Sequence, residues 1–135
     1  WPVIILLVAA AFYFPPLLWP ELRSGLAALF IPGSIIAAVG GILLYDTLTG
    51  DWASWAYTWL LIPAGVGLGL LLAALYGRWG QVVTWVGAGL LIGNVVIFSL
   101  VAMAFGGPIL KTIAAGLVIL IGLGMLIRSL VRPRA

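Results

Sequence analysis

The sequence has no cysteine and no histidine, and these two absences exclude several kinds of function at once. Without cysteine the chain has no disulfide, no thiolate metal site and no iron–sulfur cluster. Without histidine it lacks the commonest metal ligand, the usual haem ligand and the side chain that most readily carries a proton near neutral pH. We therefore predict that the protein holds no metal and no cofactor.

Charged residues are also scarce, at 7% of the chain, whereas 65% of the residues are hydrophobic. The charges lie at the ends of long apolar runs over residues 25–48, 55–76, 82–105 and 109–127. A helix rises ~1.5 Å per residue, so each run is long enough to cross a hydrocarbon core of ~30 Å. Backbone groups in lipid must bond within their own segment, which favours transmembrane helices over strands. We predict an all-α, polytopic helical bundle that forms a single transmembrane domain over residues 1–135.

The first residues predict a further, shorter span. The chain begins at Trp1 without an initiator methionine, so we expect a processed or truncated N-terminus. As a helix, residues 1–14 would be ~21 Å long, too short to cross unaided, and they lack the basic leader and cleavage site of a signal peptide. We predict a fifth span, either missing its beginning or continuing over residues 1–19 through Pro15 and Pro16, which would kink or end it. An interfacial or re-entrant segment is the alternative.

The basic residues predict the orientation of the chain. If residues 1–14 cross the membrane, five of the six basic residues share one side. These are Arg23, Arg78, Arg128, Arg132 and Arg134. Lys111 lies on the other side with Asp46 and Asp51, so the positive-inside rule predicts that the Arg-rich tail, residues 128–135, is cytoplasmic. Orientation thus explains the net charge of +3, and we predict membrane lipids as partners and no nucleic acid.

Aromatic residues surround the two turns that this topology places at the membrane surfaces. The acidic turn is flanked by Tyr45, Trp52, Trp55, Tyr57 and Trp59, and the opposite turn by Tyr76, Trp79 and Trp85. Tryptophan and tyrosine favour the headgroup layer because each has an apolar ring and a hydrogen-bonding tip. We predict that they are interface anchors, and stacking on a pigment, quinone or carbohydrate is the alternative.

Small residues recur at intervals of four along three of the runs. They are Gly33, Ala37 and Gly41, then Gly65, Gly69, Ala73 and Gly77, then Gly89 and Gly93. Lipid gives helices no hydrophobic drive to associate, so close backbone approach and dispersion contacts matter. We predict that these residues form helix-packing faces, within the chain or against a partner, and that leucine at Gly69 disrupts helix association. Pro32 and Pro63 predict an early kink in two neighbouring spans.

Polar residues within the predicted spans are few. Asn94 lies near the centre of the run 82–105, where it is expected to bond a backbone carbonyl or another helix, or to contact a ligand or ion. Asp46 and Asp51 are expected to be solvated turn residues that could pair with Lys111. With no ionisable residue near the middle of a span, a proton- or cation-coupled carrier is not favoured.

The sequence also lacks a zinc-protease His-Glu-x-x-His motif, a Ser–His pair and a phosphate-binding Gly-Lys-Ser/Thr motif, so we predict no enzymatic activity.

Four short segments carry a family resemblance. They are Trp1-Pro2-Val3-Ile4-Ile5-Leu6, Phe30-Ile31-Pro32-Gly33, Gly40-Gly41-Ile42-Leu43-Leu44-Tyr45 and Leu48-Thr49-Gly50-Asp51-Trp52. In these the chain resembles bacterial multipass proteins related to the transmembrane region of LiaF-like cell-envelope stress regulators. The resemblance implies a bacterial inner-membrane protein with a scaffolding or sensing role and transfers no functional residue. The chain departs from those regulators in ending at Arg132-Pro133-Arg134-Ala135 without their soluble C-terminal domain, which argues against a regulatory role.

Two functions follow from these features. The first is a non-catalytic structural or accessory subunit of the bacterial inner membrane, packing through its Gly-rich faces in a homo-oligomer or a larger membrane complex. The second is a small sensing or transport module that binds a lipid or apolar ligand near Asn94.

Overall fold

The computed structural model describes residues 1–132, which fold into helices with no strand. The helices are α1 (Pro2–Leu18), α2 (Arg23–Leu26), α3 (Phe30–Thr49), α4 (Trp55–Thr58), α5 (Leu61–Gly77), α6 (Gln81–Phe105) and α7 (Pro108–Val131). Short 3₁₀ turns cover Pro20–Leu22, Ala27–Leu29 and Trp52–Ser54. The predicted all-α class is confirmed. Helix α7 continues beyond the predicted end of its span at residue 127, and residues 133–135 of the predicted tail lie outside the described residues.

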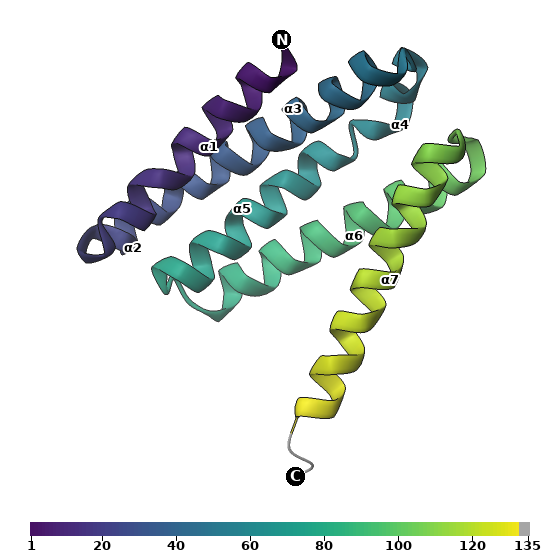
Figure 1. Cartoon of the computed structure of the whole chain (residues 1–135). Coiled ribbons are helices and arrows are strands. Elements are labelled where there is room, and N and C mark those ends of the chain that lie inside the picture. The colour runs from purple at the N-terminus through teal and green to yellow at the C-terminus, as the bar shows by residue number, and fades with distance from the viewer. Residues whose placement is uncertain (133–135) are drawn as a thin grey trace.

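The helices are arranged in chain order. Helices α1, α3, α5 and α6 lie side by side, and each runs opposite to the one before it (Figure 1). The most extensive contacts join α1 to α3, α3 to α5 and α5 to α6. Helix α7 packs on α6 near the loop that connects them and then diverges from the other helices toward its C-terminal end (Figure 1). The loops that follow α3 and α6 therefore lie at one end of the molecule, and α2 and the α5–α6 turn lie at the other.

Three helical stretches of the described chain are long and apolar enough to cross a membrane: Pro20–Thr49, Gln81–Phe105 and Pro108–Val131. Two shorter helices, Trp52–Thr58 and Leu61–Gly77, pass the same test only together, and they are bent by 52° relative to each other. Helix α1 is apolar but has only 17 residues. Three of the predicted spans thus have a matching helix, whereas the spans predicted over 55–76 and 1–19 are not matched by one straight helix of sufficient length.

Pro63 explains the break between α4 and α5. Proline has no N–H group, and inside a helix its ring clashes with the carbonyl four residues earlier, which here belongs to Trp59. The backbone bonds three residues back instead, from the Leu60 N–H to the Tyr57 carbonyl at 3.2 Å and from the Ile62 N–H to the Trp59 carbonyl at 2.9 Å. The predicted kink at this position is therefore a sharp bend that divides the expected helix in two.

Helix α1 passes through its two prolines. It includes Pro15 and Pro16 and ends at Leu18, where the Trp19 N–H still bonds the Pro15 carbonyl at 3.1 Å. Pro16 is buried. The helix expected to continue through the two prolines is therefore present, and its crossing of a membrane stays a prediction.

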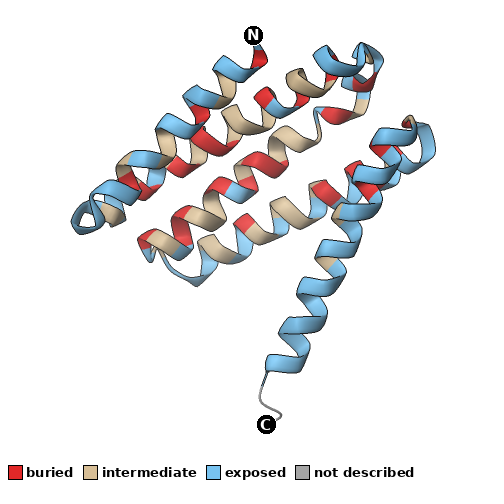
Figure 2. Ribbon diagram, in the orientation of Figure 1, coloured by how far each residue is buried: buried red, intermediate tan, exposed pale blue. Residues whose placement is uncertain are grey.

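Buried residues line the facing sides of the helices, and α7 is exposed over most of its length (Figure 2). One hydrophobic cluster joins α6 to α7 near their loop, with Phe98, Ala102, Leu110 and Ala114 at its centre. A second lies at the other end of the molecule and has Ala27, Phe30 and Ala73 at its centre. Only 11% of the most apolar window of α7 is buried, so this helix presents most of its surface to whatever surrounds the molecule.

Candidate functional site

The longest stripe of predicted packing residues lies on the side of α5 that faces α3. This stripe consists of Gly65, Gly69, Ala73 and Gly77, all buried. A Cβ atom on Gly69 would lie 2.5 Å from the Cα atom of Ile31, and one on Gly65 would lie 2.9 Å from the carbonyl oxygen of Ser34. Because both neighbours are backbone atoms, α3 and α5 approach as closely as they do only where a side chain is absent.

The other predicted packing residues fall into two groups. Gly33 contacts α1, since a Cβ atom there would lie 3.0 Å from the Cβ atom of Phe12, and Ala37 on the same helix is half-buried. Gly41, Gly89 and Gly93 are exposed, and a Cβ atom on any of them would have no neighbour within 4 Å. These three glycines therefore pack against no other described helix of the chain, and packing against a partner stays a prediction for them.

Sequence reasoning missed the glycine contact between α5 and α6. A Cβ atom on Gly67 would lie 2.7 Å from the carbonyl oxygen of Gly87, and one on Gly87 would lie 2.6 Å from the backbone nitrogen of Leu71. Successive residues of a helix are ~100° apart, so glycines two positions apart lie on nearly opposite sides. The alternation Gly65-Val66-Gly67-Leu68-Gly69 is thus a signal for two close-packed faces on α5, one for α3 and one for α6.

Asp46 is buried, contrary to the prediction of a solvated turn residue. Its side chain is 0% exposed, and its Oδ1 atom accepts a hydrogen bond of 2.6 Å from the Ser54 hydroxyl. The reason is that α3 continues through Asp46 to Thr49, and the following 3₁₀ turn brings Ser54 back onto it. The Oδ2 atom is also buried and has no hydrogen-bond partner in the described chain. Lys111 is exposed.

A small cavity of about 120 Å³ lies between α3, α4, α5, α6 and α7. Its walls include Tyr45, Phe98 and Thr58, and the buried Thr58 hydroxyl has no hydrogen-bond partner within residues 1–132. Gly41 and Leu61 line both this cavity and a wider apolar groove of about 290 Å³ that extends over α3, α5 and α6. The two hollows therefore adjoin, and together they form a mainly apolar surface whose polar lining residues are Thr58, Tyr45 and Ser34.

Asn94 is not among the residues that line the small cavity or the groove. Its Nδ2 atom donates a hydrogen bond of 2.8 Å to the carbonyl of Leu90, one turn earlier in α6. A backbone carbonyl is one of the partners expected for this side chain. A ligand contact at Asn94 stays a prediction.

Two of the predicted interface anchors connect helices. The Tyr76 hydroxyl donates to the Pro16 carbonyl at 2.8 Å, and the Trp79 indole N–H donates to the Ser24 carbonyl at 2.7 Å. The ring of Tyr76 also meets that of Phe30 edge-on at 5.6 Å between centroids. Tyr45 is half-buried beside the cavity, and the exposed anchors are Trp52, Trp55, Trp59 and Trp85. Tyr76 and Trp79 thus attach α1 and α2 to the C-terminal end of α5.

No family model, no curated protein and no solved structure matches this chain. The relationship to LiaF-like proteins stays a prediction. Within residues 1–132 no group of three or more potential metal ligands comes together.

Proposed function

We propose that the chain is a non-catalytic structural or accessory subunit of the bacterial inner membrane, and that it assembles through the outward face of α6. The stretches Pro20–Thr49, Gln81–Phe105 and Pro108–Val131 have the length and apolar composition of membrane-spanning helices, and we propose that the bent pair α4–α5 and helix α1 also lie in the bilayer. The end of the molecule that carries Arg23, Arg78 and Arg128 would face the cytoplasm.

One observation carries the proposed assembly. Two Gly-x-x-x-Gly pairs occur in the chain at Gly65/Gly69 and Gly89/Gly93, and such pairs let transmembrane helices approach closely. The first pair is covered by α3, whereas the second is exposed with open space around it. The second pair is therefore available to a helix from another molecule.

The face around this pair is continuous. Residues at intervals of three and four lie on one side of a helix, so Gly89 and Gly93 share a side of α6 with Val96 and Leu100, both of which are exposed. We commit to a second copy of the chain as the partner. An isologous dimer needs only that one patch be complementary to itself, and the same glycine face on two crossing helices meets that condition.

Cysteine cross-linking tests this assembly without competing disulfides from other cysteines of the chain, because its sequence has none. The single variant Leu100→Cys is expected to form a disulfide-linked dimer in native membranes on mild oxidation. Leu120→Cys on α7 is the matched control, since the two leucines are 63% and 67% exposed. Only the α6 variant is expected to cross-link.

Leucine substitutions then test the glycines. In the Leu100→Cys background, Gly89→Leu with Gly93→Leu should abolish the cross-link, and Gly116→Leu, at another exposed glycine with open space, should leave it intact. Cross-linking to a different membrane protein would assign the face to a heteromeric complex in place of the homodimer. A monomer that is unaffected by leucine at both glycines would rule out assembly through this face.

A small membrane sensing or transport module that binds a lipid or apolar ligand is the second candidate. The Thr58 hydroxyl at the cavity, which has no hydrogen-bond partner among the described residues, favours it. Thr58→Val would preserve the shape of the side chain and remove the polar group. A tryptophan fluorescence response to members of a lipid and quinone panel should then be lost in Thr58→Val and kept in Asn94→Leu. If the natural protein responds to no member of the panel, the structural function is the one that remains.

A further inference from the structure

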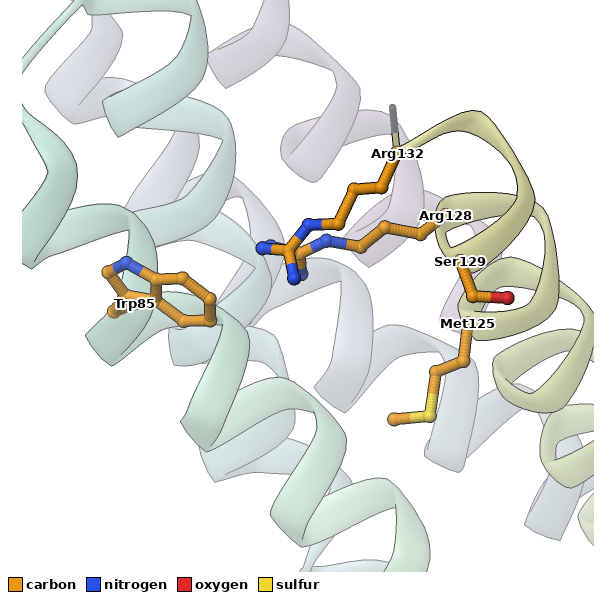
Figure 3. Close-up of a pocket in the computed structure, with 5 residues that line it drawn as sticks. All are labelled: Trp85, Met125, Arg128, Ser129 and Arg132. Carbon is orange, nitrogen blue, oxygen red and sulfur yellow. The ribbon is translucent and has the colours of Figure 1, made fainter. Parts of the chain in front are cut away.

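A separate hollow lies at the opposite end of α6 from the Thr58 cavity, between the start of α6 and the end of α7. Its volume is about 410 Å³, and it is lined by Trp85 from α6 and by Met125, Arg128, Ser129 and Arg132 from α7. Figure 3 shows that both arginine side chains leave α7 on the side of Trp85 and extend toward it. The hollow therefore has an aromatic wall on one helix and two cationic groups on the other.

Among the described residues, no carboxylate lines this hollow beside the two arginines. The guanidinium carbon of Arg128 lies 5.2 Å from the centroid of the Trp85 ring, a cation–π distance that fixes Arg128 over the indole. None of the chain's three acidic residues lines the hollow, and two of them, Asp46 in the last turns of α3 and Asp51 just after that helix, lie at the other end of the molecule. Two guanidinium groups in one hollow present paired N–H donors of the geometry that binds a phosphate.

An apolar strip continues from these arginines toward the middle of α7. Residues at intervals of three and four from Arg128 are Met125, Ile121 and Val118, so they lie on the same side of the helix. Met125 and Val118 are 56% and 41% exposed, and Ile121 is half-buried. A ligand that fills this site must therefore have an anionic end for the arginines and a long apolar part for the strip.

We propose that this site binds one anionic phospholipid. Its phosphate lies between Arg128 and Arg132, and its acyl chains lie along Met125, Ile121 and Val118. A free phosphate ion would use only the arginines and would leave the apolar strip uncovered. A basic hollow between helices at the cytoplasmic surface is a setting in which anionic headgroups are recognised. Lipid binding needs only α6 and α7 of one chain. Trp85 lies four residues before Gly89 on the same side of α6, so the lipid site adjoins the proposed dimer face.

Native mass spectrometry of the detergent-solubilised full chain tests the site. The protein is mixed with equal amounts of phosphatidylglycerol and phosphatidylcholine, and retained lipid is counted per chain. We expect one phosphatidylglycerol to be retained in preference to phosphatidylcholine. Arg128→Gln and Arg132→Gln should each lower that preference about fivefold, the effect of one basic residue near an anionic surface. Arg23→Gln, which removes the same charge outside the hollow, should leave it unchanged.

Two further measurements separate a built site from general attraction. Trp85→Leu keeps every charge but removes the aromatic wall, so it should also lower the phosphatidylglycerol preference, whereas simple charge attraction predicts no change. Inorganic phosphate at millimolar concentration should fail to displace the lipid. Equal retention of the two lipids, an equal loss in Arg23→Gln, an unaltered preference in Trp85→Leu, or displacement by phosphate would each overturn the proposed lipid site. Circular dichroism of each variant confirms that the helices are intact.

Discussion

Alanine at Gly69 should destabilise the protein even though alanine is the better helix former. In a helix, replacing glycine by alanine gains about 0.5–1 kcal/mol because the unfolded chain loses freedom. At Gly69 the new methyl group would lie 2.5 Å from the Cα atom of Ile31 and 2.8 Å from the Phe30 carbonyl oxygen, whereas ordinary contacts begin at 3.4 Å. Helices α3 and α5 must therefore move apart by about 1 Å.

The size of the effect follows from two opposing contributions. Overpacking that forces the backbone to shift costs about 1–3 kcal/mol, and the gain in helix propensity of about 0.5–1 kcal/mol offsets part of that cost. We expect Gly69→Ala to lose about 1–2 kcal/mol of unfolding free energy relative to the natural protein. Gly116→Ala is the matched control, because a Cβ atom there meets nothing within 4 Å, and it should be as stable as the natural protein or slightly more so.

Both variants can be compared in mixed micelles by titration with sodium dodecyl sulfate, with unfolding followed by far-ultraviolet circular dichroism and tryptophan fluorescence. The free energies are compared at one detergent composition. Equal stability of Gly69→Ala and Gly116→Ala would refute the reasoning, because it would mean that α3 and α5 are not in backbone contact at this position.

Three other substitutions test separate contacts. Asp46→Ala removes the acceptor of the buried Ser54 hydroxyl and should cost about 1–3 kcal/mol, while Asp46→Asn keeps an acceptor and should cost less, as thermal unfolding in detergent can measure. Tyr76→Phe removes the hydrogen bond to the Pro16 carbonyl and should cost about 0.5–1.5 kcal/mol of unfolding free energy. Amide exchange should become faster in α1 alone. Pro63→Ala should allow α4 and α5 to become one helix, so that spin labels on the two helices move apart; an unchanged distance would show that proline does not cause the 52° bend.

The sequence predicts the helical class and the spans along α3, α6 and α7, because the length of an apolar run is a direct physical requirement of the bilayer. It also predicts a kink near Pro63, since proline removes a backbone donor wherever it occurs. The size of the bend depends on how the chain restores its hydrogen bonds around Trp59, and this is decided by three-dimensional packing. A predicted single span therefore became a pair of helices.

Sequence spacing identifies a small-residue face but not the neighbour that covers it. Gly65 and Gly89 each begin a Gly-x-x-x-Gly pair, yet only Gly65 is covered by another helix of the chain. Asp46 was placed wrongly for a similar reason. Its burial depends on a turn that returns Ser54 to it eight residues later, and nothing in the local pattern fixes the direction of that turn.

The order of the helix contacts has a consequence for how the protein is made. Each long helix after α1 packs on the one that precedes it in the chain, as α3 does on α1, α5 on α3, α6 on α5 and α7 on α6. During synthesis each long helix after the first therefore finds one of its packing partners already made. Contacts between elements that are close in the sequence also form quickly, because little loop entropy is lost. We expect α1 to α6 to assemble stepwise as the chain emerges, with the sparsely packed α7 as the last and most easily detached element.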